Sequence, residues 1–197
     1  MRCCSRPSAG SRAERAAAAV AIAIVAGCAS VPPGERAPQA VDEPFSIDGR
    51  FAARRGNDAV ALSFSWSHAA PREEIVLSSP LGQAVAELEG DASVPYTELR
   101  GADGQRASAS DWASLTAKTL GLPLPVAGLV WWTRGAPRAD SPHSVQSDSA
   151  GRVALLRQDG CEVAYRYPDD SARRPSRLDL VCRDLEMRIV IDRWNRS

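Results

Sequence analysis

Cysteine and histidine are the residue types in this chain whose side chains could do chemistry, and both are few. The 197 residues contain five cysteines and two histidines. Thiols and imidazoles serve as nucleophiles, proton carriers and metal ligands only when partner groups lie beside them. Both histidines, His68 and His143, stand in polar stretches, as does the acidic pair Glu73-Glu74. We therefore expect all four side chains at the solvated surface.

Sequence motifs that mark catalytic or cofactor sites are also missing. The chain has no G-x-S-x-G elbow, no H-E-x-x-H pair, no glycine-rich phosphate loop and no metal-ligand spacing. We expect no catalytic residue, no metal and no cofactor. The sequence therefore indicates a binding protein and not an enzyme.

Two of the cysteines, Cys161 and Cys182, fall on consecutive predicted strands. If they face each other, Val163 lies opposite Leu180 and the apolar faces of the two strands agree. A disulfide between them would close a loop of about twenty residues and stabilise the fold by about 3 kcal/mol in the chain-entropy model. Two unlinked buried thiols are the alternative.

A third cysteine, Cys28, ends a segment that has the parts of an export signal. Four arginines and one glutamate precede a run of small apolar residues at 16–27. This run is shorter than the roughly 20 residues that cross a bilayer. It ends in Val25-Ala26-Gly27-Cys28, which resembles the lipobox of bacterial lipoprotein precursors. We expect a signal peptide at 1–27 and lipidation of Cys28, with an ordinary signal peptide and an incidental cysteine as the alternative.

The rest of the chain has the charge and length of one exported domain. The chain has 24 basic and 24 acidic residues, and without the leader's four arginines and one glutamate 20 and 23 remain. That is no basic excess of the kind that nucleic acid requires. Residues 28–43 are proline-rich and polar, which predicts a flexible tether before a domain at 44–197. Ala29 and Ser30 follow the anchor where inner-membrane lipoproteins commonly carry Asp, so we expect the outer membrane.

Strand patterns dominate the domain. Residues 59–67 alternate apolar and polar side chains with the period of two that a half-buried strand requires. Similar segments, separated by short turns rich in Gly, Asp and Pro, lie at 45–54, 74–79, 83–89, 94–99, 153–157, 161–167, 177–182 and 185–191. The sequence therefore predicts an antiparallel sheet that curls toward a barrel.

One helical insert interrupts the strands. We expect a helix at 111–120 with Ser110 as its cap and Gly121 at its end, followed by a short helix at 126–135. Trp131 and Trp132 are adjacent and cannot both point into one core. The helices either lie across the sheet as a lid or cap the end of the barrel.

At this point the motifs align with one family. From near Phe45 to Trp194 the chain resembles LolB, the outer-membrane receptor of lipoproteins. The matching segments, in the family's order, are Gly49-Arg50, Phe64-Ser65-Trp66, Ser79-Pro80-Leu81-Gly82-Gln83, Asp103-Gly104, Leu120-Gly121-Leu122-Pro123-Leu124-Pro125, Leu129 to Trp132, Arg134-Gly135-Ala136-Pro137, Gln158-Asp159-Gly160, Val163-Ala164-Tyr165 and Ile191-Asp192-Arg193-Trp194. Family members tend to carry Trp where this chain has Cys161.

The resemblance implies a fold and a function. The fold is mainly β, an unclosed antiparallel barrel with a helical lid that encloses an apolar cavity. The function is to accept lipoproteins from the periplasmic carrier LolA, hold their acyl chains in the cavity and insert them into the outer membrane. The protein would be a lipid-anchored, periplasm-facing monomer in a Gram-negative bacterium.

The resemblance also gives roles to individual residues. Leu81, at a turn, would protrude and help to deliver cargo into the bilayer, whereas a turn leucine folded back on the sheet is the alternative. We expect the cavity to be lined by Phe51, Phe64, Trp66, Leu77, Leu88, Trp112, Leu115, Leu129 and Trp132.

Two functions of other classes stay open on the sequence alone. One is a structural or assembly lipoprotein with a filled barrel, and the other is a lipocalin-like carrier of a small lipid. An apolar cavity separates the receptor and the carrier from the structural protein. A complex with LolA separates the receptor from the carrier.

Overall fold

The computed structural model describes residues 43–91, 96–101 and 104–195 of the chain. The expected signal peptide at 1–27, the lipidation site Cys28 and all of the expected tether except Glu43 lie outside these residues.

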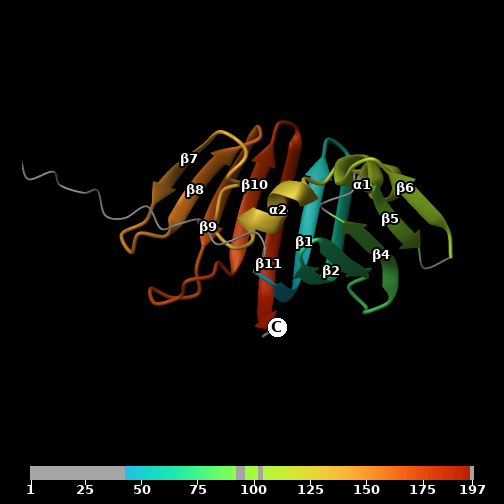
Figure 1. The fold of residues 1–197 in the computed structure, drawn as a ribbon, viewed down its shortest axis with the longest axis horizontal. Coiled ribbons are helices and arrows are strands. Elements are labelled where there is room, and N and C mark those ends of the chain that lie inside the picture. The colour runs from blue at the N-terminus through green and yellow to red at the C-terminus, as the bar shows by residue number, and fades with distance from the viewer. Residues whose placement is uncertain (1–42, 92–95, 102–103, 196–197) are drawn as a thin grey trace, which may run out of the picture. The chain divides into compact units, whose positions relative to one another are not determined.

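Eleven strands form one antiparallel sheet (Figure 1). In chain order they are β1 (Phe45–Arg55), β2 (Asp58–Ala69), β3 (Arg72–Ser78), β4 (Ala84–Asp91), β5 (Tyr96–Gly101), β6 (Arg106–Ala109), β7 (His143–Ser147), β8 (Val153–Gln158), β9 (Cys161–Arg166), β10 (Arg177–Cys182) and β11 (Leu185–Asn195). Two helices, α1 (Trp112–Leu120) and α2 (Val126–Trp132), stand between β6 and β7 in the chain.

The order of the strands explains where the helices lie. Strands β1 to β6 form one meander and β7 to β11 a second, and the meanders join where β1 pairs with β11. This leaves β6 and β7 at opposite edges, and in the described part of the chain these edges do not pair, so the sheet is not closed. The chain must therefore return from one edge to the other across a face of the sheet. It makes this crossing through α1, beside β6, and α2, in front of β1 and β11 (Figure 1).

One face of the sheet is apolar and the other is charged, as period-two alternation predicts. In β1 the buried side chains are Phe45, Ile47, Phe51 and Ala53, and equivalent positions of the neighbouring strands complete a core that the helices cover. On the opposite face arginines pair with carboxylates across strands, as Arg50 does with Asp192 at 2.8 Å. Such exposed pairs contribute little to stability, because solvent screens them.

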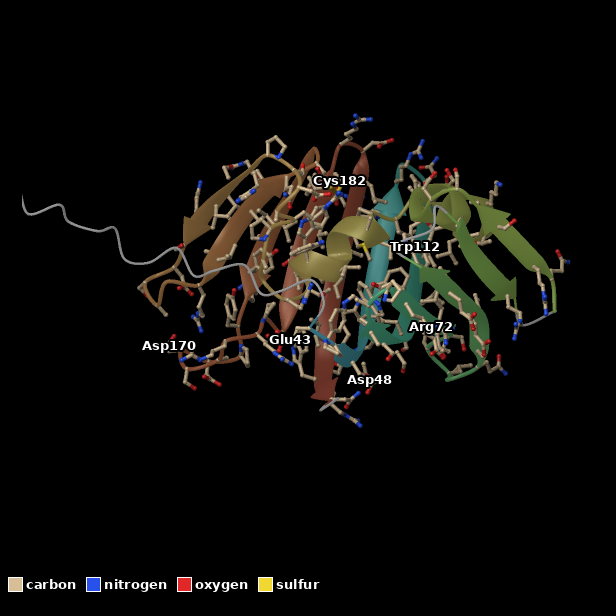
Figure 2. The ribbon with its side chains drawn as sticks, in the orientation of Figure 1. Glu43, Asp48, Arg72, Trp112, Asp170 and Cys182 are labelled. Carbon is tan, nitrogen blue, oxygen red and sulfur yellow. A yellow bond between two sulfur atoms is a disulfide. The ribbon has the colours of Figure 1, made fainter. Side chains whose placement is uncertain are left out.

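The predicted register of β9 on β10 is confirmed. Cys161 lies opposite Cys182, Val163 opposite Leu180, and Tyr165 opposite Leu178. The two cysteines are joined as a disulfide in the structure (Figure 2). It lies between neighbouring strands of the second meander.

The predicted mainly-β fold with an unclosed sheet and a helical lid is confirmed, and two edge strands were missed. Every predicted strand is present with small differences at its ends. The segment predicted at 94–99 appears as β5, and residues 92–95 lie outside the described range. The missed strands are β6 and β7, the two edges.

The cap predicted for the first helix was wrong by one residue. Asp111 is the N-cap, and its side chain accepts a hydrogen bond from the backbone N–H of Ser114 at 2.8 Å. The bonds from Ser114 hold the pKa of Asp111 below its usual value. A carboxylate satisfies the free N–H groups of a helix start as well as a hydroxyl does, so Ser110 is not needed there.

The second helix ends at Trp132, earlier than predicted. Within the described ranges no helix is long and apolar enough to cross a membrane.

Candidate functional site: an apolar pocket under the helices

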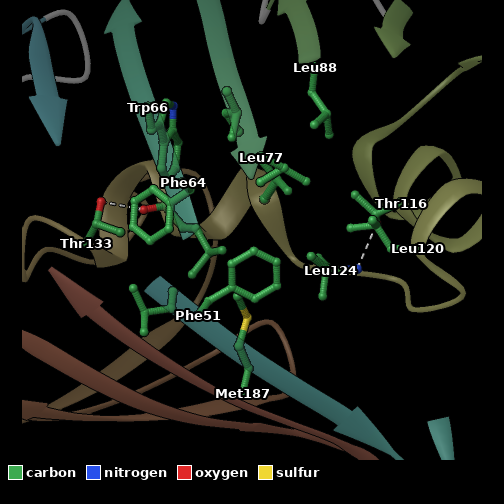
Figure 3. A pocket seen from close by; sticks show the side chains of 14 residues that line it. Phe51, Phe64, Trp66, Leu77, Leu88, Thr116, Leu120, Leu124, Thr133 and Met187 are labelled. Atoms are coloured by element: carbon green, nitrogen blue, oxygen red, sulfur yellow. Dashed lines mark hydrogen bonds between the residues drawn. The ribbon is translucent and has the colours of Figure 1, made fainter. Parts of the chain in front are cut away.

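The apolar pocket lies between the inner face of the sheet and the two helices (Figure 3). Its volume is about 50 Å³. It is lined from the sheet by Phe51, Phe64, Trp66, Ile75, Leu77, Leu88, Met187 and Ile189, and from the helical segment by Thr116, Leu120, Leu124, Val126, Leu129 and Thr133.

The polar groups of this lining are bonded within the protein and do not face the space. The Thr116 hydroxyl donates to the carbonyl of Trp112 at 2.9 Å. It accepts from the N–H of Leu124 at 2.8 Å (Figure 3). The Thr133 hydroxyl donates to the carbonyl of Leu129 at 2.8 Å. The surface that remains is hydrocarbon, which favours a ligand made of hydrocarbon.

The structure brings together most of the side chains that we expected around a cavity. Phe51, Phe64, Trp66, Leu77, Leu88 and Leu129 all line the apolar pocket. Sequence reasoning missed the lining residues Ile75, Met187 and Ile189 of the sheet and Thr116, Leu120, Leu124, Val126 and Thr133 of the helical segment. The three sheet residues sit at inward positions of strands that were predicted, so extending the alternation would have found them.

Trp112, Leu115 and Trp132 do not line the pocket, which corrects our expectation for them. On α1 the side chains that reach the pocket are Thr116 and Leu120, one turn apart. Trp112 lies a further turn back and is only partly buried, and Leu115 is fully buried in solid core.

Trp132 is directed away from the pocket by a specific hydrogen bond. Its Nε1 donates to the side-chain oxygen of Gln158, on β8, at 3.0 Å. Its ring also folds against Gly128, where an added Cβ would come within 2.5 Å of the ring. The tryptophan therefore fixes α2 to the second meander instead of lining the space beneath it.

A buried polar cluster lies at the Trp66 end of the pocket, where we expected solvated side chains. Glu73 and His68 are each 3% exposed. The Glu73 carboxylate accepts from Trp66 Nε1 at 2.8 Å, and its other oxygen lies 2.5 Å from His68 Nδ1. The expectation was wrong because β2 and β3 extend to these residues, so the period of two turns both side chains inward. His143, by contrast, is exposed on β7.

Two further side chains complete this cluster. The Phe45 ring stacks on His68 with ring centroids 4.9 Å apart. The Arg134 guanidinium lies over the Phe45 ring, 5.4 Å from its centroid, and its Nε donates to the Val130 carbonyl. Burial lowers the pKa of Arg134 below its usual value, and the carboxylates of Glu43 and Glu73 partly offset this. Through these contacts Arg134, which follows α2, meets Phe45 of β1, whose ring stacks on His68 of β2.

We expect Glu73→Leu to lower the free energy of unfolding by about 3–5 kcal/mol, because it leaves buried partners of the carboxylate unsatisfied. Glu73→Gln is the matched control, since its amide still accepts from Trp66 and donates toward His68, and it should cost much less. Urea denaturation of both variants measures the difference. Equal losses in the two variants would show that the hydrogen bonds do not hold the cluster.

Leu81 is the most exposed large apolar side chain of the described residues, at 89%. It lies in the turn between β3 and β4, which is closed by the hydrogen bond from Gly82 N–H to the Ser79 carbonyl at 2.8 Å. Its neighbours in the turn are uncharged. The turn between β3 and β4 therefore exposes an apolar side chain at the end of the sheet.

Comparison with known proteins assigns the family. The model of the family described as outer membrane lipoprotein LolB matches residues 43–194. The outer-membrane lipoprotein LolB of Azoarcus sp. (strain BH72) is 36% identical over 183 residues, covering 91% of this chain and 93% of that protein. The LolB of Chromobacterium violaceum is 34% identical over 175 residues, covering 87% and 93%. The LolB of Thiobacillus denitrificans is 33% identical over 174 residues, covering 87% and 91%. This chain therefore belongs to the LolB family of outer-membrane lipoproteins.

Proposed function

We propose that this protein receives lipoproteins from the periplasmic carrier LolA and inserts them into the outer membrane. The observation that carries the proposal is the apolar pocket, whose hydroxyl and indole groups are all bonded within the protein. Membership of the LolB family supports the role in lipoprotein localisation at the outer membrane. The protein is a transport protein and not an enzyme.

The chemistry of the cargo explains why a pocket is needed. Exposing an acyl chain of about sixteen carbons to water costs on the order of 13 kcal/mol, at about 0.8 kcal/mol per methylene. The chain must therefore pass from the carrier's cavity to this one without entering water, and then into the bilayer. In this scheme affinity that increases from carrier to receptor to membrane gives the direction.

The pocket must widen to hold such a chain. Its volume of about 50 Å³ is far below the roughly 300–1,000 Å³ of pockets that enclose drug-sized ligands. The helices are the movable wall, because the sheet side is a continuous hydrogen-bonded ladder. We propose that α1 and α2 shift outward when cargo binds.

We propose that the protein acts as a lipid-anchored monomer. Residues 1–27 would be removed as a signal peptide, Cys28 would carry the lipid, and residues 28–43 would tether the domain at 44–197. A protein with one acyl chain binds a membrane reversibly, whereas a protein with two or three chains stays anchored. Partners are therefore LolA, the acyl chains of the cargo and the outer membrane itself.

The test uses the full chain with Cys28→Ala, which carries no lipid, mixed with LolA that was preloaded with a radiolabelled lipoprotein. We expect the label to move to this protein, because the acyl chain gains a more favourable site. Co-purification after affinity capture measures the transfer. The proposal would be contradicted if the label stays on LolA although circular dichroism shows that the receptor is folded. A structural or small-lipid role would then replace it.

A further inference from the structure

A second hollow lies at the C-terminal end of α1. This groove has a volume of about 560 Å³ and is open to solvent. Its walls come from the start of β4, from β5 and β6 and from the last turn of α1, and include Val85, Ala86, Gln105, Ala107, Lys118 and Leu120. Because β4 begins at Ala84, directly after the turn that holds Leu81, the groove opens next to the exposed leucine.

One side chain, Leu120, lines both the groove and the apolar pocket. Elsewhere the two spaces are also adjacent, since Ala86 of the groove pairs across the sheet with Leu77 of the pocket. Leu120 is the last residue of α1, and Gly121 ends the helix in the left-handed conformation. Leu120 is thus a partly buried side chain shared by both hollows, and it stands on a terminal helical turn, where helices open most easily.

We infer that the acyl chain of the cargo enters the apolar pocket through this groove, past Leu120, which acts as the gate. The inference rests on the proposed function. It gives the groove one occupant, the acyl chain together with the glyceryl group that carries it. It also places the entrance beside Leu81, so that loading and delivery to the membrane use the same end of the sheet.

The chemistry of the two hollows fits the two parts of such a lipid. The pocket is hydrocarbon throughout, which suits the chain. The groove combines small apolar side chains with polar ones, among them Lys118, whose ammonium group has three N–H donors. One of these reaches the Ser108 carbonyl at 3.3 Å. The ester carbonyl oxygens of a glyceryl group are acceptors that suit the others. The groove, at about 560 Å³, also has room that the pocket, at about 50 Å³, lacks.

The test compares Leu120→Trp and Leu120→Ala, both in the full chain with Cys28→Ala. The probe is a synthetic peptide with a dipalmitoylglyceryl cysteine and a fluorophore, followed by stopped-flow fluorescence. A gate changes the rates of entry and exit together. We expect Leu120→Trp to slow association and dissociation by about tenfold each, and Leu120→Ala to speed both, with the dissociation constant changed much less. Ala117→Trp, on the exposed face of the same helix, is the matched control.

The outcomes separate the gate from the proposed function. If the unsubstituted Cys28→Ala chain does not bind the lipopeptide, the proposed function fails and the gate fails with it. If that chain binds but the Leu120 variants associate at its rate, the entrance lies elsewhere while the receptor function stands. If Leu120→Trp changes the dissociation rate alone, and with it the dissociation constant, Leu120 is a wall of the pocket and not its gate. Circular dichroism of each variant confirms that it is folded.

Discussion

Leu81→Glu is expected to leave the receipt of cargo from LolA intact and to reduce insertion into the membrane at least about 30-fold. Leu81 is 89% exposed, so its removal does not disturb the core. In the proposed mechanism it enters the bilayer at delivery, and burial of a leucine side chain contributes roughly 2 kcal/mol, which corresponds to the 30-fold change. A carboxylate at the same depth adds a further cost. Transfer of radiolabel from LolA to the lipidated protein in liposomes, and then to the lipid phase, separates the two steps.

Two controls show whether the site or only the added charge matters. Leu81→Met keeps an apolar tip and should insert cargo as the unsubstituted protein does. Val181→Glu places the same charge at another exposed apolar residue, on β10, and should have little effect. The proposed role of Leu81 is wrong if Leu81→Glu inserts normally. If Leu81→Glu also fails to take cargo from LolA, Leu81 belongs to the receiving step.

Gly49→Ala is expected to lower the free energy of unfolding by about 3 kcal/mol or more. A Cβ at Gly49 would lie 2.3 Å from the carbonyl oxygen of Val190 and 2.8 Å from the Phe64 ring. The carbonyl belongs to β11, at the register shift where this strand pairs with β1. It cannot withdraw without breaking the ladder that joins the two meanders. For a domain of this size, thermal unfolding should shift downward by about 6–12 °C.

A second substitution tests which contact causes the loss. Gly49→Ala combined with Phe64→Leu removes the ring but keeps the carbonyl, so it should recover only part of the lost stability. Full recovery of the lost stability would show that the Phe64 ring causes the strain. The packing of this ring at the pocket would then be the reason for a glycine at position 49. Ala52→Ser, on the exposed side of the same strand, is the control and should cost less than about 0.5 kcal/mol.

The strands were predictable because most of them have one buried face. In β1, β2 and β9 to β11 the alternation of apolar and polar residues marks that face directly. Because these strands follow one another through short turns, the sequence also predicts an antiparallel sheet. The edges β6 and β7 were not predictable in this way. All five residues of β7 are exposed and β6 has four residues, so neither strand carries a buried stripe that the sequence could show.

The sheet half of the pocket was predictable for the same reason, and the helical half was not. Inward positions on a strand follow from counting by two, which places Phe51, Phe64 and Leu77 correctly. The same count places His68 and Glu73 inside, but their polarity favours strands that end before them. A short helix buries several faces at once, and nothing in the sequence says which of them meets the pocket. Leu115 and Leu120 are both apolar, yet only Leu120 reaches it.

The pairing of β1 with β11 also sets the order in which the molecule can assemble. Arg50 and Asp192, neighbours across this pair, are 142 residues apart in the chain. Contacts of such separation must overcome loop-closure entropy before they gain anything, so folds built on them form slowly, in milliseconds to seconds. Until β11 arrives, β1 is an open edge that can pair with another chain. While the centre of the sheet is still unfinished, the chain therefore needs protection from aggregation.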